Sequence, residues 1–168
     1  MEFKNYISLI SFPFLVLFFG CLPAVFTAKK IPTWYKGLKK PRLNPPNWVF
    51  GPVWTILYLM IGLSGYFFWN INQEFSEEDR LEWIVYFSQL FLNFTWTPIF
   101  FGINYLLLAF LNIILLDIFT IWNIILFSEK STLAGRFLIP YMIWISFATY
   151  LNFSIWYSNR NSENSKED

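Results

Sequence analysis

Long stretches without charged residues constrain the fold of this chain more than any other feature. No Asp, Glu, Lys or Arg occurs in residues 5–28, 43–73, 83–116 or 137–159. The hydrocarbon core of a bilayer is about 30 Å thick and takes roughly 20 apolar residues to cross as a helix. Each stretch therefore holds at least one membrane span. With 56% hydrophobic and only 14% charged residues, the chain also has too little polar material to coat a soluble globule.

The third stretch is too long for one helix and is divided near its middle. Pro98 lacks a backbone N–H, and Gly102 and Asn104 favour turns. We therefore predict an all-α integral membrane protein, a five-transmembrane-helix bundle in a single domain of residues 1–158. The helices are expected at about 6–27, 48–70, 83–101, 105–127 and 133–157, with a loop at 28–47, a solvated linker at 74–82 and a polar C-terminal tail at 159–168.

The first apolar stretch has an alternative interpretation as a cleaved signal peptide. Lys4 precedes it, and the small Ala28 stands just before Lys29. However, the run exceeds the roughly 7 to 15 residues usual for a signal core. It also contains Pro13 and Pro23, and proline is more frequent in transmembrane helices than in soluble ones. These features favour a membrane span.

The distribution of cations predicts the orientation, because cytoplasmic loops are enriched in Lys and Arg. Five spans place the termini on opposite sides. On one side lie Lys29, Lys30, Lys36, Lys39, Lys40, Arg42, Arg160 and Lys166, and on the other only Lys4, Arg80, Lys130 and Arg136. The first loop and the C-terminus are therefore expected in the cytosol. A bacterial envelope membrane and the mitochondrial outer membrane both stay open.

Several kinds of chemistry are excluded by composition. The chain has no histidine, so Ser-His-Asp and Cys-His nucleophile systems are impossible. A single cysteine, Cys21, cannot build a thiolate metal site or an internal disulfide. A net charge of +1 gives no footprint for nucleic acid, and no Gly-rich phosphate motif precedes a helix. We expect no metal, no required cofactor and no nucleic-acid partner.

Aromatic residues make up 23% of the chain and include nine tryptophans. Tryptophans near predicted helix ends are expected to be anchors at the membrane interface, and these are Trp34, Trp48, Trp69, Trp83 and Trp156. Others fall inside predicted helices, namely Trp54, Trp96, Trp122 and Trp144. Ordinary bundle packing explains any one of them. Several together predict a cavity lined by flat rings.

Three motifs carry a family resemblance. The first reads Trp34-Tyr35-x-x-Leu38-x-Lys40-Pro41-x-x-x-Pro45-Pro46-x-Trp48-x-x-Gly51-Pro52-Val53-Trp54. The others read Gln89-Leu90-x-Leu92-Asn93-x-x-Trp96-x-Pro98-x-Phe100-Phe101 and Pro140-Tyr141-x-x-Trp144-x-x-Phe147-Ala148-Thr149-x-Leu151-Asn152. In order and spacing, from about residue 20 to 160, they resemble the tryptophan-rich sensory protein family, TspO, also called translocator protein or peripheral-type benzodiazepine receptor.

This resemblance implies a five-helix bundle whose loop 28–47 covers a pocket as a lid. The implied ligands are porphyrins, sterols and benzodiazepine-type drugs. Carried over by motif, the ligand-binding residues are Phe50, Gly51, Val53, Trp54, Tyr58, Asn93, Trp96, Trp144, Ala148 and Leu151. Trp54 and Tyr58 are four residues apart, as are Trp144 and Ala148, so each pair shares one helix face.

Three hypotheses about function follow. The leading one is a membrane receptor or carrier for a porphyrin or other tetrapyrrole, and the lack of histidine favours a metal-free ring over haem held by imidazole. The alternative is a light- and oxygen-dependent porphyrin-degrading enzyme in which Trp54 and Trp144 would be catalytic. A small-molecule transporter ranks third, because the chain shows no inverted repeat. Expected partners are the lipid bilayer, the tetrapyrrole, a sterol and a second copy of the chain.

Some positions depart from the family pattern. On helix four, Leu108 and Asn112 stand where some members place a tryptophan and an aspartate, which puts that pocket wall in doubt. Ile84 and Ser88 replace a glycine pair used by some members for dimer packing. Asn44 replaces an aromatic residue or a histidine of some lids.

Two further features of the sequence are independent of the three motifs. Asp117 lies inside a predicted span, so it is expected to face the bundle interior, with a hydrogen bond to a neighbouring Ser, Thr or Asn or a role in handling ligand or protons. Leu151, Tyr157 and Arg160 fit the loose sterol-recognition pattern, which matches many unrelated helices.

Overall fold

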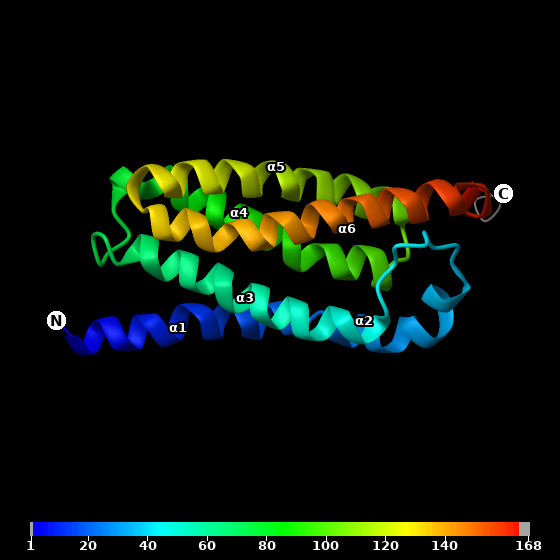
Figure 1. Cartoon of the computed structure of the whole chain (residues 1–168), viewed down its shortest axis with the longest axis horizontal. Coiled ribbons are helices and arrows are strands. Elements are labelled where there is room, and N and C mark those ends of the chain that lie inside the picture. The colour runs from blue at the N-terminus through cyan, green and yellow to red at the C-terminus, as the bar shows by residue number, and fades with distance from the viewer. Residues whose placement is uncertain (1, 165–168) are drawn as a thin grey trace.

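The computed structural model describes the backbone of residues 2–164 and the side chains of residues 5–24 and 27–160. Every regular element in that part of the chain is a helix, and the helices run side by side along one long axis (Figure 1). Asn47–Trp69, Glu77–Gly102, Leu106–Lys130 and Thr132–Arg160 are long and apolar enough to cross a membrane, and Asn5–Cys21 is a shorter apolar helix. The expected all-α membrane bundle is confirmed.

The first predicted helix is broken in two. Helix α1 covers Glu2–Cys21 and α2 covers Ala24–Lys30, followed by a π-helical turn at Ile31–Tyr35. The break falls at Pro23, whose nitrogen has no hydrogen to continue the ladder of α1. The chain thus leaves the first span through α2 before it enters the loop that leads to α3.

The remaining elements are α3 (Asn47–Trp69), a 3-10 turn (Glu77–Asp79), α4 (Arg80–Thr97), a π-helical turn (Pro98–Gly102), α5 (Leu106–Lys130) and α6 (Thr132–Asn164). The turn between α4 and α5 lies where Pro98 and Gly102 predict it, and Asn104 takes the left-handed conformation with φ 59°. Helix α6 continues past the expected end at residue 157, because no glycine or proline follows Pro140. Residues 165–168 of the expected tail lie outside the described part.

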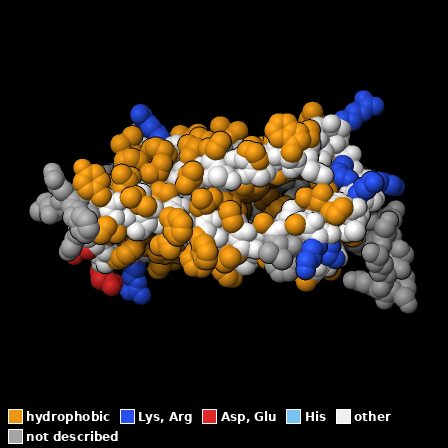
Figure 2. All heavy atoms as spheres, turned by 90° about the horizontal axis from the view of Figure 1, so that it is seen from below, with side chains coloured by type: hydrophobic (Ala, Val, Ile, Leu, Met, Phe, Trp, Pro, Cys, Tyr) orange, Lys and Arg blue, Asp and Glu red, His pale blue; other side chains and the backbone are white. Residues whose placement is uncertain are grey.

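The long helices pack in a ring: α1 against α3, α3 against α6, α6 against α5 and α5 against α4, with fewer contacts between α4 and α1. Large side chains fill the interior, among them Ile61, Tyr86 and Tyr141. The outer surface is also apolar, and Phe91 and Ile143 are 67% and 68% exposed. Hydrophobic side chains cover the length of the molecule while charged ones gather at its ends (Figure 2). That pattern suits a protein whose sides face lipid.

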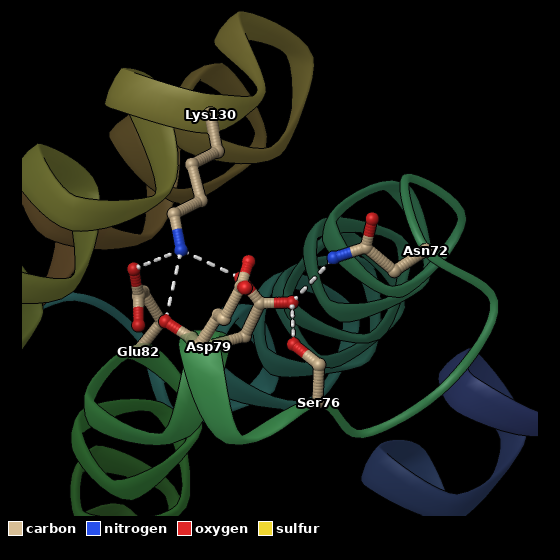
Figure 3. Close-up of polar contacts among 6 residues, drawn as sticks. Asn72, Ser76, Asp79, Glu82 and Lys130 are labelled. Carbon is tan, nitrogen blue, oxygen red and sulfur yellow. Dashed lines mark hydrogen bonds and ion pairs between the residues drawn. The ribbon is translucent and has the colours of Figure 1, made fainter.

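A cluster of charges fixes the end of the bundle away from the 28–47 loop (Figure 3). The Lys130 ammonium lies 2.6 Å from Asp79 Oδ1 and 2.7 Å from Glu82 Oε1. Asn72 Nδ2 and Ser76 Oγ each donate to Asp79 Oδ2 over 2.8 Å. The expectation of a solvated linker at 74–82 is therefore wrong for Asp79 and Glu82, which are buried because the end of α5 supplies their counter-ion.

Helices α1 and α3 approach closely at Gly62. A Cβ placed on Gly62 would overlap the backbone of Pro13 and lie 2.8 Å from the Phe12 carbonyl oxygen. Small residues at helix contacts are the usual route to tight association in lipid, where apolar side chains gain little by leaving it.

The variant Gly62→Ala is expected to unfold at a lower temperature than the wild type. Its methyl group meets backbone rather than a movable side chain, so α1 must shift, at a cost of roughly 1 to 3 kcal/mol. Gly51→Ala on the same helix is the matched control, because its Cβ meets nothing within 4 Å. Thermal unfolding in detergent followed by circular dichroism measures both, and equal melting temperatures for Gly62→Ala and wild type would contradict the close approach.

Candidate ligand-binding site

A cavity of about 270 Å³ lies inside the bundle next to the 28–47 loop. Helices α1 to α6 all contribute to its wall. The motif-derived residues that line it are Phe50, Gly51, Trp54, Tyr58, Asn93, Trp96, Trp144, Ala148 and Leu151. Val53 does not line it and packs, half-buried, against the hydrophobic core. It is adjacent to Trp54 in sequence, and consecutive residues of a helix point about 100° apart.

Aromatic rings form much of the wall. The ring centroids of Trp54 and Tyr58 on α3 are 5.3 Å apart with planes tilted by 31°. Trp144 of α6 meets the edge of Phe50 at 6.0 Å. Trp96 of α4 stacks on Phe100 at 5.1 Å and 22°. These surfaces come from three helices, so a flat ligand would meet ring faces and edges on several sides.

Not every tryptophan lies where the sequence suggests. Trp122 does not contribute to the cavity and is 41% exposed on the outer side of α5. Trp83, expected at the membrane interface, is only 5% exposed and contacts Phe68 and Tyr86 edge-on at 5.2 and 5.7 Å. Position relative to a helix end shows depth in the bilayer, but it does not show whether a side chain faces lipid or the core.

A buried hydrogen-bonded chain includes two residues of the wall, Tyr58 and Asn93, and continues to Tyr141, which does not line the cavity. Tyr58 Oη donates to Asn93 Oδ1 over 3.2 Å, and Asn93 Nδ2 donates to Tyr141 Oη over 2.8 Å. All three residues are buried. The Asn93 amide therefore joins α4 to α3 on one side and to α6 on the other.

The 28–47 loop supplies wall residues that spacing alone did not reveal. Ile31 and Tyr35 line the cavity, and the Tyr35 ring lies 5.5 Å from that of Phe101. Tyr35 Oη donates to Asn44 Oδ1 over 2.9 Å, so the residue that departs from some family lids has a structural role here. Burial raises the pKa of the Tyr35 hydroxyl, and this group accordingly stays protonated as a donor at neutral pH.

The α5 wall differs from the pattern considered for some family members. Ile113 and Leu116 line the cavity. Leu108 is 41% exposed on the outer surface, and Asn112 Nδ2 donates to Thr95 Oγ1 over 3.3 Å instead. These placements explain how the wall is closed without a tryptophan or an aspartate at the two departing positions.

The structure also places Asp117 and the three residues of the sterol pattern. Asp117 is half-buried on α5 and its Oδ2 accepts a 2.7 Å hydrogen bond from Thr149 of α6, which is the kind of partner expected for it. Leu151 faces the cavity, whereas Tyr157 is 52% exposed with the Arg160 guanidinium 4.1 Å above its ring. The sterol pattern is therefore not brought together on one face of α6.

Several further residues line the cavity; some lie outside the three motifs, and others, such as Asn152, lie within a motif but were not expected to bind ligand. They are Gly20, Cys21, Ala24, Thr27, Asn47, Thr55, Thr97, Ile113, Leu116, Asn152 and Ile155. Two ring nitrogens in the wall, Trp96 Nε1 and Trp144 Nε1, are buried without a hydrogen-bond partner among the described residues. Chemically, the site offers flat apolar surfaces, which suits a planar ligand.

These features define an integral membrane protein, a helical bundle that encloses an aromatic cavity beneath a folded loop. The model of the TspO/MBR family matches residues 11–157. The chain therefore belongs to the TspO/MBR family, as its three motifs indicated.

Relatives of known name cover most of the chain. It is 41% identical over 155 residues to the tryptophan-rich protein TspO of Archaeoglobus fulgidus, which covers 92% of this chain and 99% of that protein. It is 38% identical over 126 residues to the human translocator protein, covering 75% of each. It is 35% identical over 128 residues to the tryptophan-rich sensory protein of Cereibacter sphaeroides, covering 76% and 78%.

Replacing Asn93 by Leu is expected to lower the melting temperature of the protein. The substitution preserves side-chain size but leaves the hydroxyls of Tyr58 and Tyr141 without their amide partner, at about 1 to 3 kcal/mol for each buried unsatisfied group. Tyr58→Phe, which deletes a single hydrogen bond, should have a smaller effect. Differential scanning fluorimetry in detergent would compare the three proteins. If Asn93→Leu has the same melting temperature as the wild type, the Asn93 amide does not hold the three helices together.

Proposed function

We propose that this protein is a membrane receptor or carrier that binds a metal-free porphyrin or a related tetrapyrrole in the bundle cavity. The observation that carries the proposal is the cavity wall, in which Trp54, Trp96 and Trp144 come from three different helices. A porphyrin is a flat aromatic disc, and each aromatic pair contributes about 0.5 to 1.5 kcal/mol beyond its burial. Other flat apolar molecules, including benzodiazepine-type drugs, fit the same chemistry.

The charges near the cavity support an anionic ligand. The loop beside it carries the exposed Lys36, Lys39 and Arg42. None of the acidic side chains described by the structure lines the cavity; they occur in residues 74–82, at Asp117 and at Glu129. Propionate groups at the edge of a porphyrin would be attracted to the basic end, and Lys or Arg can hold a carboxylate through charge-assisted hydrogen bonds.

The same asymmetry supports a topology in which the loop and the C-terminus face the cytosol. The two termini of the bundle lie at opposite ends (Figure 1). The loop end carries most of the cations, and the positive-inside rule assigns that end to the cytoplasmic side.

The size of the cavity sets a condition on this function. At about 270 Å³ it falls just below the roughly 300 to 1,000 Å³ typical of sites for drug-sized ligands. A tetrapyrrole would therefore need either the loop or the helices around the site to move outward.

Titration with protoporphyrin tests the proposal through tryptophan fluorescence. We expect saturable quenching in detergent or nanodiscs, much reduced in the double variant Trp54→Phe with Trp144→Phe, because the stacking faces are lost. Trp122→Phe is the matched control, since this ring lies on the outer surface. Absence of saturable quenching in the wild type, or equal quenching in the double variant, would refute the proposal. Illumination of the loaded protein tests the enzymatic alternative. A new bilin-like absorbance that appears in the wild type and is absent from the Trp54→Phe, Trp144→Phe double variant would favour an enzyme.

Enlarging Ala148 should weaken the binding of flat ligands at least tenfold. Ala148 lines the cavity one turn from Trp144, so Ala148→Leu fills space that the ring would occupy. A loss of about 1.4 kcal/mol is enough for that factor. Ser146→Leu is the control, because residue 146 is exposed on the same helix. Equilibrium titration with protoporphyrin compares the variants, and normal affinity in a helical, folded Ala148→Leu protein would mean that Ala148 does not border the ligand.

A further inference from the structure

The 28–47 loop is tied to α6 by one side chain. Asn159 Oδ1 accepts a 3.1 Å hydrogen bond from the backbone N–H of Lys39, and Asn159 Nδ2 donates over 3.0 Å to the backbone carbonyl of the same lysine. The two residues are 120 positions apart in the sequence. Figure 1 shows the loop between α2 and α3 beside the C-terminal part of α6.

The Asn159 amide is also held by its own helix. Its Nδ2 also donates to the carbonyl of Ile155, one turn earlier on α6, over 2.7 Å. Asn159 is only 8% exposed. A primary amide presents one donor and one acceptor side by side, and it can pair with both backbone groups of one residue. Aspartate offers no donor for this pairing, and leucine offers neither group.

The loop itself is a folded unit. The Lys40 ammonium donates to the carbonyls of Tyr35 and Leu38 over 2.7 and 3.1 Å. The hydrogen bond from Tyr35 Oη to Asn44 Oδ1 also joins two parts of the loop. These bonds lie within residues 35–44, so that segment can keep its shape when it moves, whereas Ile31–Tyr35 continues the helical backbone of α2.

Its contacts with the bundle are of three kinds. One is a hydrogen bond from Lys30 Nζ to the side-chain oxygen of Asn104 over 3.1 Å, and the long, flexible lysine side chain can follow small movements. Trp34 and Tyr35 pack edge-on or tilted against Phe100 and Phe101, with centroids 5.5 to 6.3 Å apart. Such apolar contacts tolerate sliding, because burial has little directional preference. The Asn159 pair is directional and breaks when the loop moves by about an ångström. It is thus the contact that distinguishes a closed loop from an open one.

We propose that Asn159 is a positioning residue that latches the loop over the cavity mouth and controls how fast ligand enters and leaves. This inference rests on the proposed function, because it assigns the regulation of the same site. Ile31 and Tyr35 of the loop form part of the cavity wall, and with the loop in this position the cavity measures only about 270 Å³. Movement of the loop away from the bundle widens the cavity for a ligand, and the latch sets how often this movement occurs.

A latch of this kind has a distinctive kinetic signature. It closes the loop in both the free and the loaded protein, so its removal raises the association and the dissociation rate constants together. The equilibrium affinity then changes little. Loss of an ordinary ligand contact acts differently, since it raises mainly the dissociation rate constant.

The experiment compares wild type with Asn159→Leu and Asn159→Asp in nanodiscs. Hydrogen–deuterium exchange of the ligand-free protein is read on peptides that cover Lys39, and stopped-flow tryptophan quenching by protoporphyrin gives both rate constants. In Asn159→Leu we expect Lys39 exchange and both rate constants to rise by roughly tenfold, as loss of two hydrogen bonds of ordinary net strength allows. The dissociation constant should change less than threefold. Asn159→Asp keeps the acceptor and should fall between wild type and Asn159→Leu.

Ser158→Leu is the control, because its side chain is exposed on the neighbouring position of α6 and makes no loop contact in the structure. Unchanged exchange at Lys39 in Asn159→Leu would overturn the latch whatever the ligand is. Faster exchange with unchanged rate constants would overturn the gating role and point to entry between helices from the lipid. A wild type that shows no saturable quenching would remove the proposed function and the gating role with it, while the exchange data would still decide the contact.

Discussion

The hydrogen bonds that join Asn93 to Tyr58 and Tyr141 determine how the rest of the interior is arranged. Apolar side chains gain little by leaving lipid for one another, so directional bonds and close packing must hold membrane helices together. The Asn93 amide supplies such bonds to α3 and α6 at once. The Tyr58 ring is further fixed by Gly20 of α1, because a Cβ at Gly20 would lie 2.5 Å from that ring. The floor of the cavity is thus held from α1, α4 and α6.

Much of this arrangement could be predicted from the sequence, because the chemistry of lipid leaves few choices. Charge-free stretches long enough to cross a bilayer predicted the helical bundle, and Pro98 with Gly102 predicted the position of the turn between α4 and α5. Residues spaced by one helical turn, such as Trp144 and Ala148, do share the cavity face. Local spacing works there because a helix fixes the relative direction of its own side chains.

The errors come from relations between segments. Val53 lies next to cavity residues in sequence but faces the core, and Trp122 faces outward, because the rotation of a helix about its axis depends on its neighbours. Asp79 is buried only because Lys130 reaches it from the end of another helix. Asn159 looked like part of a polar tail, and its partner in the loop is far away in sequence. No local pattern carries that information.

The two ends of the bundle are held by interactions of unequal strength, and this difference bears on where a ligand can pass. At one end Lys130 bridges Asp79 and Glu82, whose side chains are almost fully buried. Charge-assisted hydrogen bonds are roughly twice as strong as neutral ones. The loop end has the neutral Asn159 pair, aromatic contacts and a single charge-assisted hydrogen bond, from Lys30 Nζ to the side-chain oxygen of Asn104. Movement that enlarges the cavity therefore costs least at the loop end. That end also carries the exposed cations, so the place that opens most easily is the place toward which an anionic ligand is attracted.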